Sequence, residues 1–302
     1  MNNYSTDKLI NIAAFTHKVP RIAKNFGDAV SKPFWKIISQ CDINIKNIIT
    51  DKSPAYLTIG SILKLSNSNS TIIGTGFICE DDDLGTGNWG ERNSRVDSIP
   101  LKILSVRGPR TRNKLINMKI DCPTNYGDPL IIMPLVYNKK NHTKRYDIGI
   151  IPHYIDYNSK SVNNMMDKFR SNKKKVIKID ILCGQNYKSF IDKILECEYI
   201  ISSSLHGVMM GIVYGKKTIW TEFSDKVFGE RFKFYDFLES IDIHNHECTN
   251  KNNSKILKQY IKVNPYILKK TGSDIINICP FIDINRKKNL DRIWRNHCNK
   301  LT

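Results

Sequence analysis

Three consecutive serines and a nearby histidine form the pattern in this sequence that points most directly to chemistry. The apolar run 199–202 has the character of a buried strand and ends at the first serine. Ser203 and Ser204 follow it, and His206 lies where a small-residue helix begins. Hydroxyls and the free N–H groups of a helix N-terminus bind anions, and an imidazole exchanges protons near pH 7. His206 therefore either belongs to a site that binds an anion and moves a proton, or merely caps the turn.

An α/β framework must position these residues. Apolar runs predict strands within 70–78, 102–105, 146–152, 175–181, 199–202 and 217–220, and helical spacing predicts helices at 109–118, 189–196 and 205–214. The segment 55–66 fits either a strand or a helix. The alternation is typical of parallel sheets with crossover helices, whose carboxyl strand ends meet at the ligand-binding edge. We therefore expect an α/β fold.

The length of 302 residues suggests two domains. The polar, basic stretch 138–145 separates the halves and predicts a linker between an N-terminal domain, 1–140, and a C-terminal domain, 146–284. The segment 285–302 is basic and partly amphipathic. We expect it to form a helix that packs back on the body.

Composition narrows the function classes. Lysine plus arginine exceeds aspartate plus glutamate by 47 − 29 = 18, which suits nucleic acid, an anionic membrane surface or phosphorylated small molecules. The chain has no secretory signal pattern, no apolar run of membrane-spanning length and no RNA-binding or zinc-finger motif. Its eight cysteines show no CxxC spacing. We expect a cytoplasmic protein with reduced thiols that does not bind nucleic acid.

Three other motifs carry little weight. The glycine pattern 85–90 follows an acidic loop where a dinucleotide site requires a strand, and the acids 81–83 are better interpreted as a solvated turn than as a DxD site. His244, His246 and Cys248 have no second cluster that would complete a metal site. We therefore expect neither a bound nucleotide nor a metal.

A series of short motifs runs through most of the chain in a fixed order. They are 25–28 (Asn-Phe-Gly-Asp), 59–63, 74–77, 105–112 (Ser-Val-Arg-Gly-Pro-Arg-Thr-Arg), 126–129, 150–154 and 203–207 (Ser-Ser-Leu-His-Gly). In sequence and in order, these motifs resemble the polysaccharide pyruvyl transferase family.

The resemblance implies an enzyme that transfers the pyruvyl group of phosphoenolpyruvate to two hydroxyls of one sugar. The products would be a cyclic ketal and phosphate, with phosphoenolpyruvate as donor substrate and no separate cofactor or metal. The acceptor would belong to a cell-surface polysaccharide, such as an exopolysaccharide, capsule or O-antigen, or to its lipid-linked precursor. The implied fold is two Rossmann-like domains, similar to GT-B glycosyltransferases, with a central cleft.

The resemblance also implies catalytic roles. His206 would be the general acid or base, Arg107 would bind a carboxylate or phosphate, and Lys226 would contact phosphate as a point charge. Arg107 could instead pair with a structural carboxylate, and Lys226 could be a solvated surface lysine.

Binding residues follow from the same motifs. Ser203, Ser204, Leu205 and His153 would bind the donor, and Asn25, Gly27 and Asp28 would face the acceptor. Asp28 could instead cap the following helix. Ser204 departs from the family, because some members have an arginine at this position. His153, Lys216 or Lys217 are candidates to replace its charge.

Two alternative functions stay open. One is a GT-B glycosyltransferase that uses a nucleotide sugar, and the other is a catalytically silent carbohydrate-binding or scaffold protein. The positive charge also predicts peripheral contact with an anionic membrane face. The residues expected at that contact are Arg286, Lys287, Lys288, Arg292 and Arg295, unless they form a solvated helix face.

Overall fold

The computed structural model describes residues 9–15, 22–81, 84, 98–139, 141–229, 231–252 and 255–301. The glycine pattern at 85–90 and two of the three acids before it, Asp82 and Asp83, lie outside these residues.

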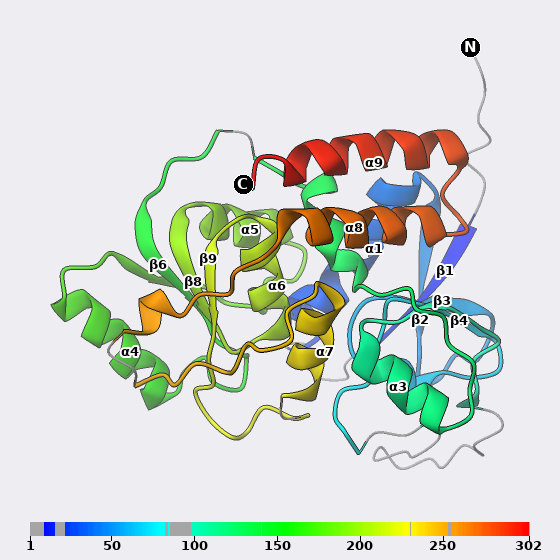
Figure 1. The fold of residues 1–302 in the computed structure, drawn as a ribbon, viewed down its shortest axis with the longest axis horizontal. Helices are drawn as coiled ribbons and strands as arrows, with labels where there is room; N and C mark the ends of the chain where they lie inside the picture. The colour runs from blue at the N-terminus through cyan, green and yellow to red at the C-terminus, as the bar shows by residue number, and fades with distance from the viewer. Residues whose placement is uncertain are drawn as a thin grey trace.

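The first half of the chain forms a five-stranded parallel sheet in the order β2-β1-β3-β4-β5 (Figure 1). Its strands are β1 (Leu9–Ala14), β2 (Asp42–Asn47), β3 (Ala55–Leu57), β4 (Ser70–Ile73) and β5 (Lys102–Ser105). The chain starts in the interior of the sheet, adds β2 on one side and then continues on the other. The order therefore reverses between β1 and β3.

The second half forms a four-stranded parallel sheet in the order β7-β6-β8-β9. Its strands are β6 (Tyr146–Ile151), β7 (Val176–Lys178), β8 (Cys197–Ser202) and β9 (Lys217–Trp220). Here the order reverses between β6 and β8. In parallel sheets such reversal points open a crevice beyond the carboxyl strand ends, where ligands bind.

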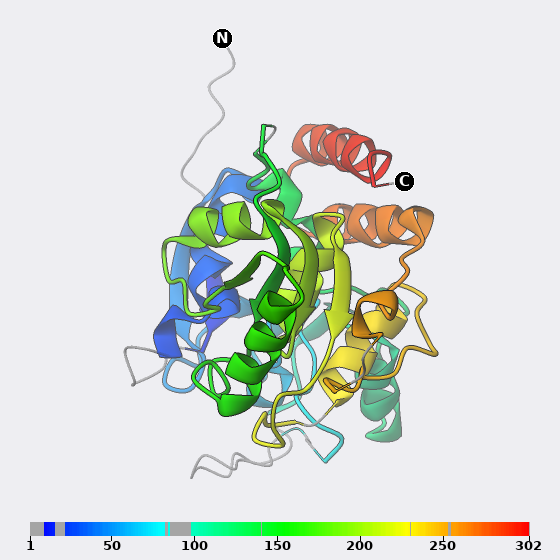
Figure 2. The same ribbon diagram turned by 90° about the vertical axis from the view of Figure 1, so that its left-hand side faces the viewer.

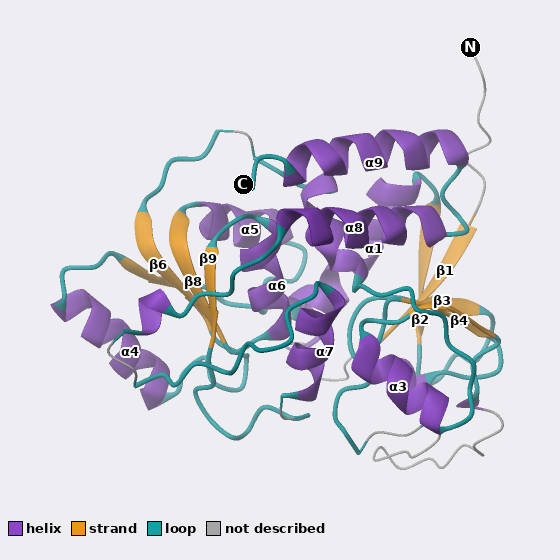
Figure 3. Ribbon diagram, in the orientation of Figure 1, coloured by secondary structure: helices purple, strands orange, loops and turns teal. Residues whose placement is uncertain are grey.

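Helices cover the sheets and fill the space between them (Figure 3). They are α1 (Phe26–Ser39), α3 (Pro109–Asn117), α4 (Lys160–Ser171), α5 (Tyr187–Leu195), α6 (Leu205–Val213), α7 (Phe232–Ser240), α8 (Pro265–Ile278) and α9 (Ile284–Cys298), with short 3-10 helices η1 (Ile22–Lys24), η2 (Leu63–Leu65), η3 (Pro129–Leu135) and η4 (Ile256–Lys258). Helix α4 packs on one face of the second sheet (Figure 2), whereas the apolar helix α6 is buried along its whole length against β8, β9 and η3.

The two C-terminal helices lie side by side and connect the halves (Figures 1 and 2). Arg286 of α9 donates to the Ile37 and Ile38 carbonyls at the end of α1, at 2.8 and 3.1 Å. Near the other end of α9, His297 Nε2 lies 2.7 Å from the Val213 carbonyl of α6. Phe281, between α8 and α9, packs its ring against Trp35 of α1. The last two helices thus brace both sheets.

The two parallel sheets with their helices confirm the predicted α/β class. That they form two Rossmann-like domains of GT-B type, limited to 1–140 and 146–284 and followed by 285–302, stays a prediction. In the described part of the chain, no helix has both the length and the apolar character needed to cross a bilayer.

Candidate functional site

A cavity of about 530 Å³ lies where the carboxyl strand ends of the two sheets face each other. Phe15 follows β1, Ser61 follows β3, His153 follows β6, and Ser204 follows β8, so both reversal points contribute to the wall. The lining residues are Phe15, Asn25, Asp28, Gly60, Ser61, Ile62, Lys64, Leu65, Ile78, His153, Tyr154, Ser204, Leu205, His206, Phe228 and Lys233.

The three serines shape the turn between β8 and α6. The Ser202 hydroxyl donates to the Ile151 carbonyl (2.7 Å) and accepts from the Ser204 N–H (3.0 Å). Ser203 Oγ accepts from the His153 N–H (2.8 Å), which ties the end of β6 to the end of β8. Ser204 and Leu205 line the cavity, whereas Ser203 is buried and does not line it. Ser203 therefore positions His153, and the predicted binding of the donor by Ser204 and Leu205 stays a prediction.

The His206 imidazole is buried in the cavity wall and has an unused nitrogen. Within the described residues, its Nε2 has no hydrogen-bond partner. Its ring lies edge-on to Phe26, with centroids 6.2 Å apart. Burial, together with the charges of Lys233 and Arg107, lowers the pKa of His206 to about 4. The ring is therefore neutral at pH 7 and able to accept a proton.

Gly27 contacts this ring and does not line the cavity. A Cβ added at Gly27 would lie 2.0 Å from His206 Cε1, so only glycine leaves room for the imidazole. The predicted acceptor contact of Gly27 is thus replaced by a packing contact that fixes His206.

Asn25 and Asp28 line the cavity at the start of α1. Asn25 occupies the N-cap position, and its Nδ2 donates to Asp28 Oδ2 at 3.1 Å. Asp28 lies in the first turn, so the alternative that it caps the helix is wrong. Burial raises the pKa of Asp28 to about 6, against the opposing effect of the Asn25 hydrogen bond. A carboxylate with this pKa can take up a proton near neutral pH.

His153 also faces the cavity, with its ring against Tyr154 at a centroid distance of 4.3 Å. Burial and the neighbouring Lys233 and His206 lower the pKa of His153 to about 3. The side chain is therefore neutral at pH 7. It can donate or accept a hydrogen bond there, but it does not replace the charge that Ser204 lacks.

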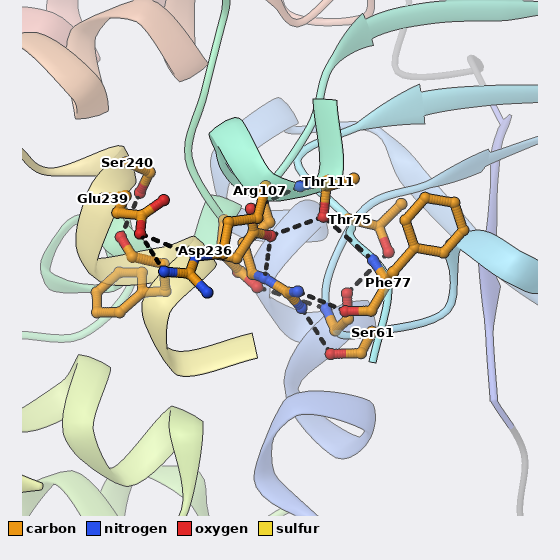
Figure 4. Close-up of polar contacts among 12 residues, drawn as sticks. Ser61, Thr75, Phe77, Arg107, Thr111, Asp236, Glu239 and Ser240 are labelled. Atoms are coloured by element: carbon orange, nitrogen blue, oxygen red, sulfur yellow. Dashed lines mark hydrogen bonds and ion pairs between the residues drawn. The ribbon is translucent and has the colours of Figure 1, made fainter. Parts of the chain in front are cut away.

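Arg107 does not reach the cavity, contrary to the expected direct anion contact. Its side chain is fully buried, and Nε pairs with Asp236 Oδ2 of α7 at 2.9 Å (Figure 4). Nη1 donates to Ser61 Oγ at 2.6 Å, and Nη2 donates to the Phe77 carbonyl. Every guanidinium nitrogen is thus engaged, and the pairing with a structural carboxylate is the alternative that the structure shows.

The ion pair of Arg107 and Asp236 is part of a contact that holds the first half of the chain against the second. The Asp236 carboxylate also accepts from the Thr111 N–H and hydroxyl of α3, at 2.9 and 2.7 Å. A Cβ at Gly108 would lie 1.8 Å from the Asp236 carbonyl oxygen, so α7 rests directly on the Gly108 backbone. The segment that begins at Arg107 is therefore a buried junction between α3 and α7, and it contacts the lining residue Ser61.

Lys226 is exposed and does not line the cavity, so the structure does not bring it together with His206. Its backbone N–H donates to Ser224 Oγ at 3.2 Å. Lys216 and Lys217 lie at the amino end of β9, where they contact the Leu195 carbonyl and Glu198. The cavity is at the opposite strand ends, so neither can replace the missing arginine charge.

Lys233 of α7 is one of two lysines in the cavity lining that sequence reasoning missed, the other being Lys64. Lys233 lines the cavity seven residues after Lys226. The available signal was a lysine between Phe232 and Phe234 in an aromatic run. A helix that buries such a run must bury the stem of the lysine as well.

The cluster around His246 shows no metal geometry. In the part of the chain that the structure describes, no three His, Cys, Asp or Glu side chains come together as ligands. His244 pairs with Asp242 at 3.0 Å, and Glu247 accepts from the Tyr235 hydroxyl at 2.8 Å.

The fold and the cavity define an α/β protein with a cavity between the facing edges of two parallel sheets. Comparison with known proteins gives the family. The polysaccharide pyruvyl transferase model matches residues 25–224, more than half of the chain. An uncharacterized protein of Acanthamoeba polyphaga mimivirus is 28% identical over 217 residues, which cover 71% of this chain and 69% of that protein. The chain belongs to the polysaccharide pyruvyl transferase family.

Proposed function

We propose that this protein transfers the pyruvyl group of phosphoenolpyruvate to two hydroxyls of one sugar, forming a cyclic ketal and releasing phosphate. The observation that carries the proposal is the neutral His206 imidazole, whose Nε2 has no hydrogen-bond partner among the described residues and which lines a cavity of about 530 Å³. A cavity of this size accommodates phosphoenolpyruvate together with a sugar ring.

The reaction requires two protons to leave the acceptor. One hydroxyl oxygen bonds to C2 of phosphoenolpyruvate while C3 gains a proton. The C2–O bond to phosphate then breaks, and its electron pair leaves with the phosphate. The second hydroxyl oxygen bonds to C2 and loses its proton. One of these two protons ends on C3 and the other on phosphate, so both protons of the acceptor are accounted for.

Two residues of the cavity match these proton transfers. His206, neutral at pH 7, accepts the proton of the first hydroxyl and delivers it to C3. Asp28, whose pKa is about 6, accepts the proton of the second hydroxyl, and Asn25 orients its carboxylate. The Ser204 N–H is already bonded to Ser202 Oγ, so the Ser204 hydroxyl and the backbone N–H of Leu205, at the N-terminus of α6, are the groups offered to the donor anion.

The acceptor in this proposal belongs to a cell-surface polysaccharide or its lipid-linked precursor. The protein would act in the cytoplasm, at the membrane face where such a precursor is carried, in a GT-B-like arrangement of two domains. These points rest on the family and on the surplus of positive charge.

Incubation with phosphoenolpyruvate and a panel of synthetic glycosides tests the proposal. We expect loss of phosphoenolpyruvate, an equal release of phosphate, and an acceptor that gains one pyruvyl group in mass spectrometry. Release of a nucleotide from a nucleotide sugar, with phosphoenolpyruvate untouched, would instead show a glycosyltransferase and overturn the proposal.

A further inference from the structure

Lys233 is held in the cavity wall almost without solvent contact. Its side chain extends from the first turn of α7, and the residue is only 7% exposed. Its ammonium donates to the Phe228 carbonyl at 2.9 Å, which uses one of its three hydrogens. Lysines are almost never this buried unless they are paired. Yet within the described residues no carboxylate forms an ion pair with Lys233.

Two groups act on the charge of Lys233 in opposite directions: Arg107 adds positive charge, and the Cys79 thiol favours the charged ammonium. Arg107 lies behind the wall, and burial together with the Arg107 charge lowers the pKa of Lys233 to about 8. The charge of Lys233 in turn helps to lower the pKa values of His153 and His206. The carboxylate of Asp236 is engaged by Arg107 and Thr111, outside the cavity wall. Among the described residues, this corner of the cavity therefore holds a positive charge that no carboxylate balances.

Asp28 is the carboxylate among the described lining residues, and it is bonded to Asn25 at the start of α1. The pKa of Tyr154 responds to Asp28, whereas those of His153 and His206 respond to Lys233. The cavity thus has an acidic part beside Tyr154 and a cationic part at Lys233, with the two histidines beside the cation.

We propose that the Lys233 ammonium directly contacts an anionic group of the donor, its phosphate or its carboxylate. Lys233 would then take the anion-binding role that was expected of Lys226 and Arg107. The inference rests on the proposed function, in which the donor is phosphoenolpyruvate. A bound anion supplies the missing counter-charge. It also favours the protonated form of the neighbouring His206, which must hold a proton before passing it to C3.

Replacing Lys233 with methionine keeps an unbranched side chain that is one atom shorter and removes the charge. A hydrogen bond to a charged group contributes enough that its loss should weaken phosphoenolpyruvate binding about 10- to 100-fold, measured by titration calorimetry. Lys226→Met is the matched control, because it removes the same charge from the exposed lysine seven residues earlier. We expect its affinity to stay within about twofold of the unaltered protein.

Thermal unfolding without ligand separates binding from a structural role. Because Lys233→Met removes a buried charge that faces Arg107 and has no carboxylate partner, the melting temperature should stay the same or rise. Lys233→Arg, which keeps the charge, should retain more affinity than Lys233→Met.

Three outcomes would overturn the inference. They are an unchanged affinity in Lys233→Met, an equal loss in Lys226→Met, or a Lys233→Met protein that no longer folds. If the unaltered protein does not bind phosphoenolpyruvate, the proposed function fails, and this inference fails with it.

Discussion

His206 combines a buried ring, a pKa of about 4 and an Nε2 atom that has no hydrogen-bond partner among the described residues, and its proposed catalytic role can be separated from donor binding. In His206→Ala we expect kcat to fall by about 10² to 10⁴, because the group that moves the proton is lost in the transition state. Donor affinity should change much less, since the proposed anion contact is Lys233. His142→Ala, at an exposed histidine, is the control and should leave kcat unchanged. Full activity of His206→Ala would leave His206 as a turn residue.

A change at Gly27 tests the position of the His206 ring in a second way. Gly27→Ala places a methyl group where His206 Cε1 lies, so kcat should fall and stability should drop by about 1–3 kcal/mol. In the His206→Ala background the ring is absent, and the same glycine change should cost far less in denaturant unfolding. An equal cost in both backgrounds would contradict the proposed contact.

Protonation of Asp28 should cause the loss of activity at acidic pH, which is the acidic limb of the kcat/KM profile. Its pKa of about 6 lies above the ordinary value of 3.8, so kcat/KM should fall as the pH drops below about 6 and the base becomes protonated. The same shift means that the folded protein binds the Asp28 proton more tightly than the unfolded chain does. The stability from this group is fully present below pH 3.8 and is lost as the pH rises through about 6.

Asp28→Asn removes both effects. We expect kcat to fall, the acidic limb of the kcat/KM profile to flatten, and the melting temperature at pH 8 to equal or exceed that of the unaltered protein. A profile with the same limb in Asp28→Asn would assign that limb to another group.

At the scale of elements, the sequence allowed us to predict where strands end. It did not allow us to predict which residues of distant segments pack against those ends. Apolar runs located the strands before His153 and Ser204, and parallel sheets bring such ends together, so these parts of the cavity followed from local pattern. Arg107 also follows a strand, but its partner Asp236 is 129 residues away and becomes visible only when α7 packs on α3. The sequence therefore suggested an anion site where the fold has a buried ion pair.

The lysine expected from the resemblance lies away from the cavity for a related reason. Lys226 and Lys233 both follow β9, and the resemblance pointed to Lys226. Helix α7 starts at Phe232, and its register directs Lys233 to the cavity, while Lys226 lies in the preceding exposed loop. Resemblance matches a residue to a position in a motif, but the side chain that enters a site depends on packing between distant segments.

The junction of α3 and α7 should dominate the stability of the contact between the halves. Arg107→Met leaves the Asp236 carboxylate buried without a counter-charge, which should cost about 3–5 kcal/mol in the free energy of unfolding. Adding Asp236→Leu removes that charge as well, and the double variant should recover part of the loss. If Arg107→Met is instead as stable as the unaltered protein but has lost donor binding, the guanidinium is a ligand and its burial does not describe the working enzyme.

For the molecule as a whole, the surplus is 18 positive charges. Some of the basic residues form contacts within the protein, and others are exposed to solvent. On α9, Arg286 caps α1, Lys287 donates to the Asn277 carbonyl at 2.7 Å, and Arg295 pairs with Asp291 at 2.7 Å. Lys288 and Arg292 are exposed. The predicted membrane contact of α9 is therefore best tested at these two residues, because Arg286 and Lys287 are bonded to neighbouring helices and Arg295 is paired within α9.

The double variant Lys288→Glu/Arg292→Glu reverses both exposed charges beside Ile284 and Ile293, which are 64% and 41% exposed. Each basic residue near an anionic surface contributes about 1 kcal/mol, so co-sedimentation with phosphatidylserine vesicles should weaken at least about tenfold and should fall with added salt for the unaltered protein. Lys168→Glu/Lys174→Glu, with the same charge change on and just after α4, controls for net charge. Equal weakening by both pairs would show that total charge, and not α9, drives the attraction. Binding insensitive to salt and to anionic lipid would remove the electrostatic contact altogether.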